Sequence, residues 1–122
     1  MGIAYHYLAN GKTLVATATG RITPADNDRS NHHIKAELER HPGLKLMVDM
    51  RAAEVAATPV AMIAMMDAFF TLVGHQMPIA IITAGLPDDP NAMLVQTKAF
   101  IAGARTQVFE REDAAIAWLD RQ

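Results

Sequence analysis

The chain has 122 residues, of which 51% are hydrophobic and 20% are charged. This length and composition predict one globular domain with its own core, and they exclude a disordered chain. A formal net charge of −2 provides no broad positive field for nucleic acid or for an anionic membrane. Because the sequence has no cysteine, disulfides, thiolate metal sites and cysteine nucleophiles are excluded as well.

The most apolar stretch of the chain, residues 60–73, is too short to cross a membrane. A spanning helix needs roughly 20 consecutive apolar residues, and this stretch is interrupted by Asp67 and Thr71. The N-terminus also lacks the basic region and apolar run of a signal peptide. We therefore expect a cytoplasmic protein without a membrane span.

The chain begins with two strand-like runs, residues 3–8 and 13–19, and Asn10-Gly11 lies between them. Asn-Gly in this position is a strong β-hairpin signal, because both residue types tolerate a positive φ. The second run alternates, so that a covered face is expected to carry the set Leu14, Ala16, Ala18 and Ile22. The opposite face is expected to be largely in water.

A helix is predicted over residues 24–40, because Thr23 is a good N-cap and Pro24 suits the first helical position. Its apolar stripe is narrow, and it consists chiefly of Ile34 and Leu38. We expect this helix to lie on the surface with the polar residues 26–31 in water.

Strands and helices alternate through the rest of the chain. Mostly apolar strands are predicted at 44–50 and 78–84, with a connection over 51–57 and a helix from Thr58-Pro59 to Val73. A further helix over 91–102, a short strand over 106–109 and a last helix from Glu112 complete the chain. The order predicts one α/β domain over residues 1–122, with a mixed sheet of about five strands, an N-terminal β-hairpin and about four helices.

Three segments resemble the SpoIIAA-like proteins, which are relatives of the STAS fold of anti-sigma-factor antagonists. The hairpin ends in Gly20-Arg21-Ile22-Thr23, the central strand ends in Leu46-Met47-Val48-Asp49-Met50-Arg51, and the last helix carries Ala114-Ala115-Ile116-Ala117-Trp118-Leu119. The resemblance covers nearly the whole chain. It implies a STAS-like α/β fold, no known catalysis, and a role in protein interaction or in binding an apolar ligand.

The resemblance also places Thr58 at the position of the family's phosphorylation switch. Antagonists of this type carry an Asp-Ser-Ser-Gly turn there, whereas this chain has Ala56-Ala57-Thr58-Pro59. The acid and the serines are absent, so we expect the Thr58 hydroxyl to cap the following helix.

The sequence shows no catalytic or metal-binding pattern. Ser30, His32 and His33 are too close together on one helix to form a serine triad. No pair of histidines has the spacing of a zinc site, and the glycines form no phosphate-binding loop. We expect no catalytic residue, no metal and no cofactor.

Acidic residues at strand ends leave one alternative open. Asp49 lies near the end of the central strand, and Asp88 and Asp89 follow the next one. Ligands of open α/β sheets gather at the carboxyl ends of strands, so these acids could serve a small enzyme or a phosphoacceptor domain.

The helix over residues 60–73 is the main functional candidate. Its apolar side chains cover more than the usual third of a helix surface. These side chains are either buried in the core or contact a partner or an apolar ligand. Methionine favours the second alternative, because its flexible side chain suits adaptable binding surfaces. The candidate surface consists of Met62, Met65, Met66, Phe69 and Phe70. We predict a non-enzymatic, regulatory domain that uses this helix to bind a protein partner, a second copy of itself or a nonpolar small molecule.

Overall fold

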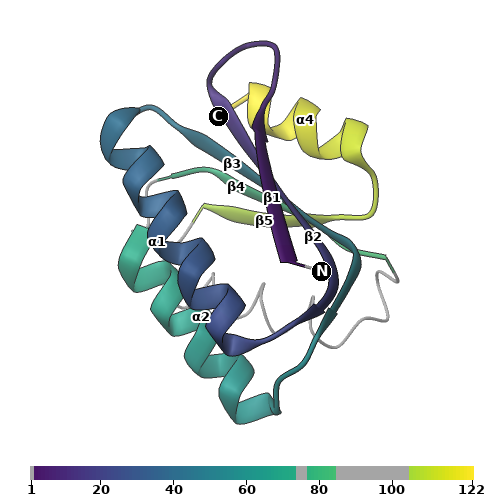
Figure 1. Cartoon of the computed structure of the whole chain (residues 1–122). Helices are drawn as coiled ribbons and strands as arrows, with labels where there is room; N and C mark the ends of the chain where they lie inside the picture. Colours follow the sequence, from purple (N-terminus) through teal and green to yellow (C-terminus); the bar gives the residue numbers. More distant parts are fainter. Residues whose placement is uncertain (1, 74–76, 85–104) are drawn as a thin grey trace.

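A five-stranded sheet forms the centre of the structure, with strands in the order β1-β2-β3-β4-β5. The computed structural model describes residues 2–73, 77–84 and 105–122 (Figure 1). The strands are β1 (Gly2–Tyr7), β2 (Thr13–Ile22), β3 (Lys45–Val55), β4 (Ile79–Ile82) and β5 (Thr106–Phe109). The helices are α1 (Pro24–Arg40), α2 (Pro59–Val73) and α4 (Glu112–Asp120).

The sheet is mixed, as predicted. β1 and β2 form an antiparallel hairpin, and β2, β3, β4 and β5 are parallel to their neighbours. The Asn10 side chain shapes the hairpin turn by accepting a hydrogen bond of 2.9 Å from the backbone N–H of Lys12. Gly11 follows with a φ of +68°, a conformation that a glycine adopts without strain.

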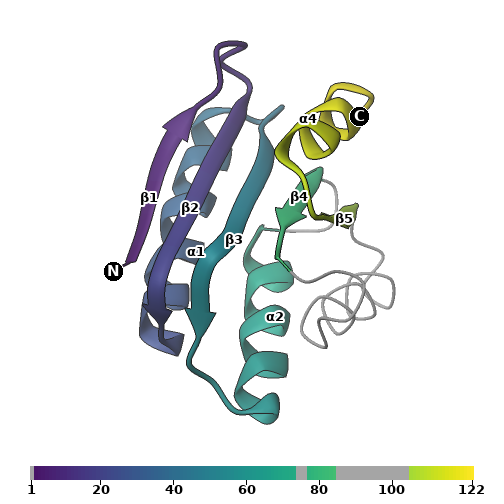
Figure 2. The same ribbon diagram turned by 90° about the vertical axis from the view of Figure 1, so that its right-hand side faces the viewer.

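Helices cover both faces of the sheet. Helices α1 and α2 lie side by side on one face, and α4 lies on the other (Figures 1 and 2). The first face packs Leu14, Leu46 and Ile79 against Ile34 of α1. The second face packs Val15, Met47 and Ala80 against Ala115 and Leu119 of α4. The core is therefore divided by the sheet into two layers.

The second face of β2 is covered by helix α4, which differs from the prediction that it lies largely in water. The predicted covered face is correct, since Leu14, Ala16, Ala18 and Ile22 are all at most 3% exposed. The opposite face is not largely in water, because Val15 is 2% exposed and packs in the cluster of α4. The alternation of β2 did not reveal this second cover because it depends on a helix almost 100 residues later in the chain.

The helix boundaries follow the predictions more closely than the strand boundaries, since β2 runs three residues beyond its predicted end and β4 is shorter than predicted. Helix α1 occupies residues 24–40, and α2 begins at Pro59, both as predicted. Strand β3 continues to Val55, so the predicted connection over 51–57 is wrong for most of its length. The extension exists because β3 keeps pairing with β2 as far as Ile22↔Val55. The helix predicted over 91–102 lies outside the described residues, which contain three helices.

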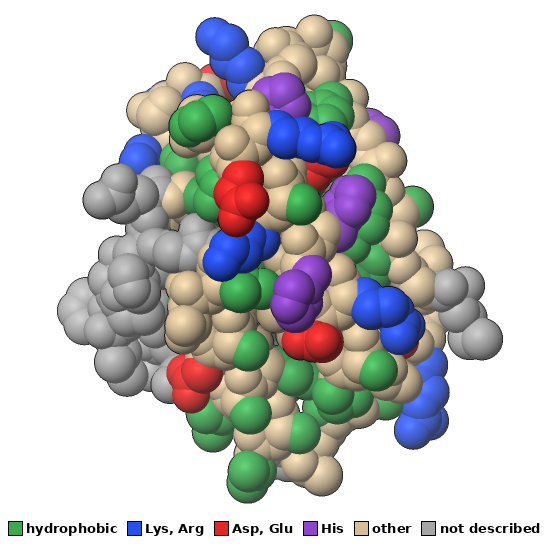
Figure 3. Space-filling model, turned by 60° about the vertical axis from the view of Figure 1, so that its left-hand side comes forward, with side chains coloured by type: hydrophobic (Ala, Val, Ile, Leu, Met, Phe, Trp, Pro, Cys, Tyr) green, Lys and Arg blue, Asp and Glu red, His purple; other side chains and the backbone are tan. Residues whose placement is uncertain are grey.

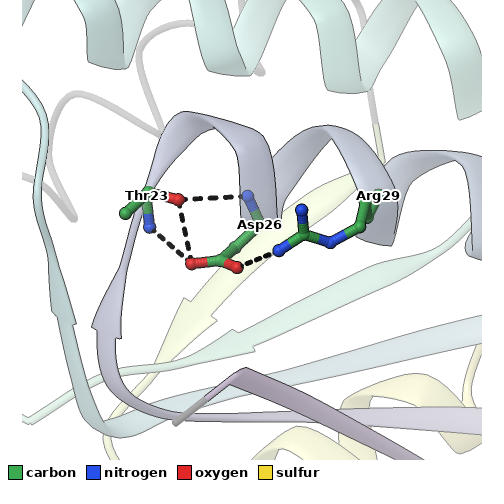
Figure 4. Close-up of polar contacts among 3 residues, drawn as sticks. All are labelled: Thr23, Asp26 and Arg29. Carbon is green, nitrogen blue, oxygen red and sulfur yellow. Dashed lines mark hydrogen bonds and ion pairs between the residues drawn. The ribbon is translucent and has the colours of Figure 1, made fainter.

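Helix α1 begins with a capping box (Figure 4). The Thr23 hydroxyl accepts a hydrogen bond of 3.2 Å from the backbone N–H of Asp26, and the Thr23 backbone N–H donates one of 2.9 Å to the Asp26 carboxylate. Arg29 forms an ion pair with the same carboxylate. The hydrogen bond from the Thr23 backbone N–H is the main reason that the pKa of Asp26 lies below its usual value, and the hydrogen bond with the Thr23 hydroxyl lowers it further.

The capping box predicts a dependence of stability on pH. A carboxyl whose pKa is lowered by folding stabilises the protein above its unfolded pKa, and this contribution is lost as the pH falls through the folded value. Asp26→Asn is therefore expected to lower the free energy of unfolding at neutral pH, and the gap to the wild type should close in acid. Urea unfolding of both proteins over a range of pH measures the gap. A gap that stays constant down to pH values below the ordinary carboxyl pKa would contradict this assignment.

The docking of α4 predicts a large effect at Leu119, which is 1% exposed. Leu119→Ala is expected to lower the free energy of unfolding by about 2–5 kcal/mol, because it removes buried methyl groups and leaves a cavity. Asp120→Ala, at the next and exposed position, serves as the control and should change it by less than about 0.5 kcal/mol. Equal effects of the two substitutions in chemical denaturation would show that α4 is not part of the core.

Candidate functional site

A cavity of about 410 Å³ lies between the sheet and the helices α1 and α2. Its volume is in the range of about 300–1,000 Å³ that is usual for small-molecule sites. The lining comes mainly from β2, β3, α1 and α2, and most of it is apolar. The elements that form it are thus those on one face of the sheet.

Helix α2 supplies one wall of the cavity. Met62, Met66 and Phe70 follow one another at intervals of four residues and are 9%, 7% and 4% exposed. They form a cluster with Val55 and Phe69. Met65 and Phe69 are half-buried, and both also line the cavity. The structure therefore brings the five predicted residues of α2 together, with the most buried of them facing the interior.

Small side chains on the sheet leave room for the cavity. Ala16 and Ala18 of β2 are 2% and 1% exposed and lie on the face that is covered by α1 and α2. Ala16 pairs with Val48 of β3, which lines the cavity from the neighbouring strand. A larger side chain at either alanine would project into this space.

The wall formed by α1 is polar, and here the prediction was wrong. Residues 26–31 were expected in water, but Ser30 is 7% exposed and Asn31 is 2% exposed. Both line the cavity, together with Asn27. The signal was present in the spacing, because Ser30 and Asn31 precede Ile34 by four and three residues and so share its face. Sequence reasoning missed them because it sorted the helix by residue type.

The outer side of α2 carries few large apolar groups. Val60 is 79% exposed and Ile63 is 38% exposed, and the other exposed positions of this helix are alanines, Asp67 and Thr71. Figure 3 shows the molecule turned toward the side of α1 and α2, where acidic, basic and histidine side chains are interspersed. The face in this view has no broad patch of one charge.

Asp49, a candidate for acid–base chemistry, lies away from the cavity. It alternates with Val48 and Met50, which line the cavity, so its side chain lies on the opposite face of the sheet. The Arg51 guanidinium donates two hydrogen bonds, of 3.0 and 2.8 Å, to the carboxylate. These bonds, with the Arg51 backbone N–H and charge, hold the pKa of Asp49 below its usual value, although partial burial opposes them.

The other acidic candidates, Asp88 and Asp89, lie outside the described residues. In the part of the chain that the structure describes, no group of three or more His, Asp or Glu side chains is placed to hold a metal ion. None of the described helices is long and apolar enough to cross a membrane.

Residues 13–120 match the family model of the SpoIIAA-like proteins, and this match decides the family of the chain. The chain belongs to the SpoIIAA-like family. No curated protein matches it.

Solved structures show the same fold. An uncharacterised protein of the DUF3478 family with a SpoIIAA-like fold, from Shewanella loihica PV-4, is 17% identical, with a TM-score of 0.71 over 97% of this chain and 93% of that chain. The anti-sigma factor antagonist SpoIIAA in its unphosphorylated form is 10% identical, with a TM-score of 0.57 over 98% of both chains. The Bacillus cell fate determinant SpoIIAA in the phosphorylated form is 10% identical, with a TM-score of 0.50 over 97% and 99%.

In this SpoIIAA-like domain, Thr58 caps α2. Its hydroxyl accepts a hydrogen bond of 3.1 Å from the backbone N–H of Ala61, and its carbonyl accepts one of 2.8 Å from that of Met62. The predicted capping role is confirmed. The cap fixes the start of the helix whose inner side chains form the wall of the cavity.

Loss of the cap predicts a moderate loss of stability. Thr58→Ala is expected to lower the free energy of unfolding by about 1 kcal/mol, because the N–H of Ala61 loses its partner. Thr58→Ser keeps the hydroxyl and should stay close to the wild type. Chemical denaturation of the three proteins provides the comparison, and an alanine variant as stable as the serine variant would rule out the capping role.

Proposed function

We propose that this SpoIIAA-like domain is a non-catalytic module that binds a small, mostly apolar molecule in the cavity between the sheet and α1–α2. The observation that carries the proposal is the inward-facing stripe of Met62, Met66 and Phe70 along a cavity of about 410 Å³. Apolar side chains that line a cavity gain van der Waals contacts from an apolar occupant. Flexible methionine side chains can adjust to the shape of such an occupant.

A regulatory role fits this kind of site. One relative of the same fold is named as an anti-sigma factor antagonist, and its structures are of unphosphorylated and phosphorylated forms. A ligand that binds only the folded domain stabilises it by an amount that grows with the logarithm of the ligand concentration above Kd, so it can act as a signal without any chemical step. We propose regulation through occupancy of the cavity.

The alternative of a protein partner or a homodimer on α2 has less support. The five candidate residues of α2 line the cavity, and the most buried of them leave little surface for a second protein. Val60 and Ile63 are the large apolar residues that remain exposed on this helix. They provide a smaller apolar area than the wide stripe that the sequence predicted for such a contact.

The alternative of a small enzyme or a phosphoacceptor also has less support. A catalytic carboxyl acid would need a raised pKa in a cleft, whereas Arg51 lowers the pKa of Asp49. Asp49 also lies on the face of the sheet opposite to the cavity. The acid and the cavity therefore do not form one site.

The proposal predicts that the neutral dye N-phenyl-1-naphthylamine binds the domain with increased fluorescence. Met66→Glu is expected to weaken this binding by more than about tenfold, because it places a charge without a partner in an apolar wall. Ile63→Glu, one turn earlier on the outer side of the same helix, is the matched control and should change binding by less than about twofold. Circular dichroism on each variant shows whether it is folded.

A second substitution covers the case in which Met66→Glu does not fold. Ala18→Leu adds apolar volume inside the cavity without a charge, so it should block the dye and preserve the fold. Sedimentation velocity on the same proteins tests the dimer alternative. If Ile63→Glu converts a dimer into monomers while the dye fails to bind the wild type, then the outer side of α2 is the working surface and the proposal is wrong.

A further inference from the structure

Two polar side chains face the cavity without hydrogen-bond partners. Ser30 and Asn31 are 7% and 2% exposed, and both line the cavity from α1. None of the hydrogen bonds among the described residues involves either side chain, and their polar atoms stay accessible, whereas the fully buried atom without a partner in the described part of the chain is the Thr106 hydroxyl. They therefore differ from Thr23 at the start of the same helix, whose hydroxyl is bonded to Asp26.

The large majority of buried polar groups have a hydrogen-bond partner. A buried group without a partner loses its hydrogen bonds to water and gains none in the protein, which is unfavourable in free energy. A hydroxyl and an amide can each both donate and accept a hydrogen bond. Ser30 and Asn31 thus offer a matched pair of donors and acceptors at one wall of an otherwise apolar cavity.

The charge of the lining indicates what kind of group they would bind. The described lining residues include no Lys, Arg or His, and the one charged residue among them is Glu54, which is exposed. Among these described residues a buried carboxylate or phosphate would find no cation to pair with, and burying an unpaired ion is very costly. An uncharged polar group meets no such penalty.

We propose that Ser30 and Asn31 bind the uncharged hydroxyl of an amphiphilic ligand, whose apolar body lies against Met62, Met66 and Phe70. This inference rests on the proposed function, and it specifies the chemistry of the ligand. The polar wall of α1 sets the orientation, and the methionine and phenylalanine wall of α2 holds the apolar part. The ligand class is a neutral alcohol with an apolar chain or ring system.

The test is a displacement of N-phenyl-1-naphthylamine by 1-decanol and by decanoate at pH 8, where decanoate is ionised. The two displacers share one alkyl chain and differ in the charge of the polar end. We expect 1-decanol to displace the dye from the wild type at a concentration at least tenfold lower than decanoate. The opposite order would overturn the inference.

Variants of α1 separate a ligand contact from a structural role. Asn31→Leu keeps the branched shape and removes the amide, so the affinity for 1-decanol should fall roughly 3- to 10-fold while dye binding stays the same. Ala36→Leu, on the exposed side of α1, is the control and should change neither affinity.

The outcomes distinguish this inference from the proposed function. If the dye does not bind the wild type, the proposed function itself fails. If the dye binds but Asn31→Leu leaves the affinity for 1-decanol unchanged, then Asn31 is satisfied in another way, for example by a bound water, and only the present inference is overturned. Ser30→Ala provides the same readouts if Asn31→Leu does not fold.

Discussion

The parallel pairing of β2 with β3 is the constraint on which the rest of the structure depends. The two strands remain paired from Thr13↔Lys45 to Ile22↔Val55, and the backbone N–H of Ala56 continues the ladder to the carbonyl of Ile22. Helix α1 begins two residues after Ile22, and α2 begins four residues after Val55. This register therefore starts both helices at the same edge of the sheet, and they run side by side across one face (Figure 1).

The cavity follows from this arrangement and from side-chain size. Helices α1 and α2 lie over strands whose side chains on that face include Ala16 and Ala18. These small side chains do not fill the space between the sheet and the helices. The helices differ in what they contribute, since α2 presents methionine and phenylalanine and α1 presents serine and asparagine. The opposite face of the sheet shows the contrast, because there Leu119 and Ala115 of α4 pack directly on Val15 and Met47. The α4 face thus packs directly on the sheet, whereas the other face combines a core cluster around Ile34 with the cavity.

Local chemistry in the sequence was sufficient to predict the starts of the elements. The Thr-Pro pairs at 23–24 and 58–59 mark the first turns of α1 and α2, and Asn10-Gly11 marks the hairpin. These signals need only a few neighbouring residues, and all three were confirmed. The sequence also singled out the methionine and phenylalanine side chains of α2, which the structure places along the cavity, although whether they face a core, a partner or a ligand could not be decided from one helix.

The features that sequence missed all depend on contacts between distant segments. The extension of β3 through Arg51 and Glu54 has no apolar pattern, and it exists because β2 offers a partner as far as Ile22. The burial of Ser30 and Asn31 requires α2 to lie beside α1, and polar residue types alone suggested water. The cover over Val15 comes from α4. For β3 and Val15 the local sequence favours one environment and the tertiary structure provides another, whereas for Ser30 and Asn31 only the residue types, and not their spacing from Ile34, favoured water.

The methionines provide the most direct measurement of the central claim, that the space between the sheet and α1–α2 is a ligand site. With ¹³C-labelled methionine methyl groups, titration with N-phenyl-1-naphthylamine should shift the signals of Met62 and Met66, which line the cavity. The signal of Met47, which is more deeply buried and lies on the face of α4, should not move. Single Met→Leu substitutions assign the signals. Unchanged signals of Met62 and Met66 at saturating dye, or a larger shift of Met47, would contradict the account.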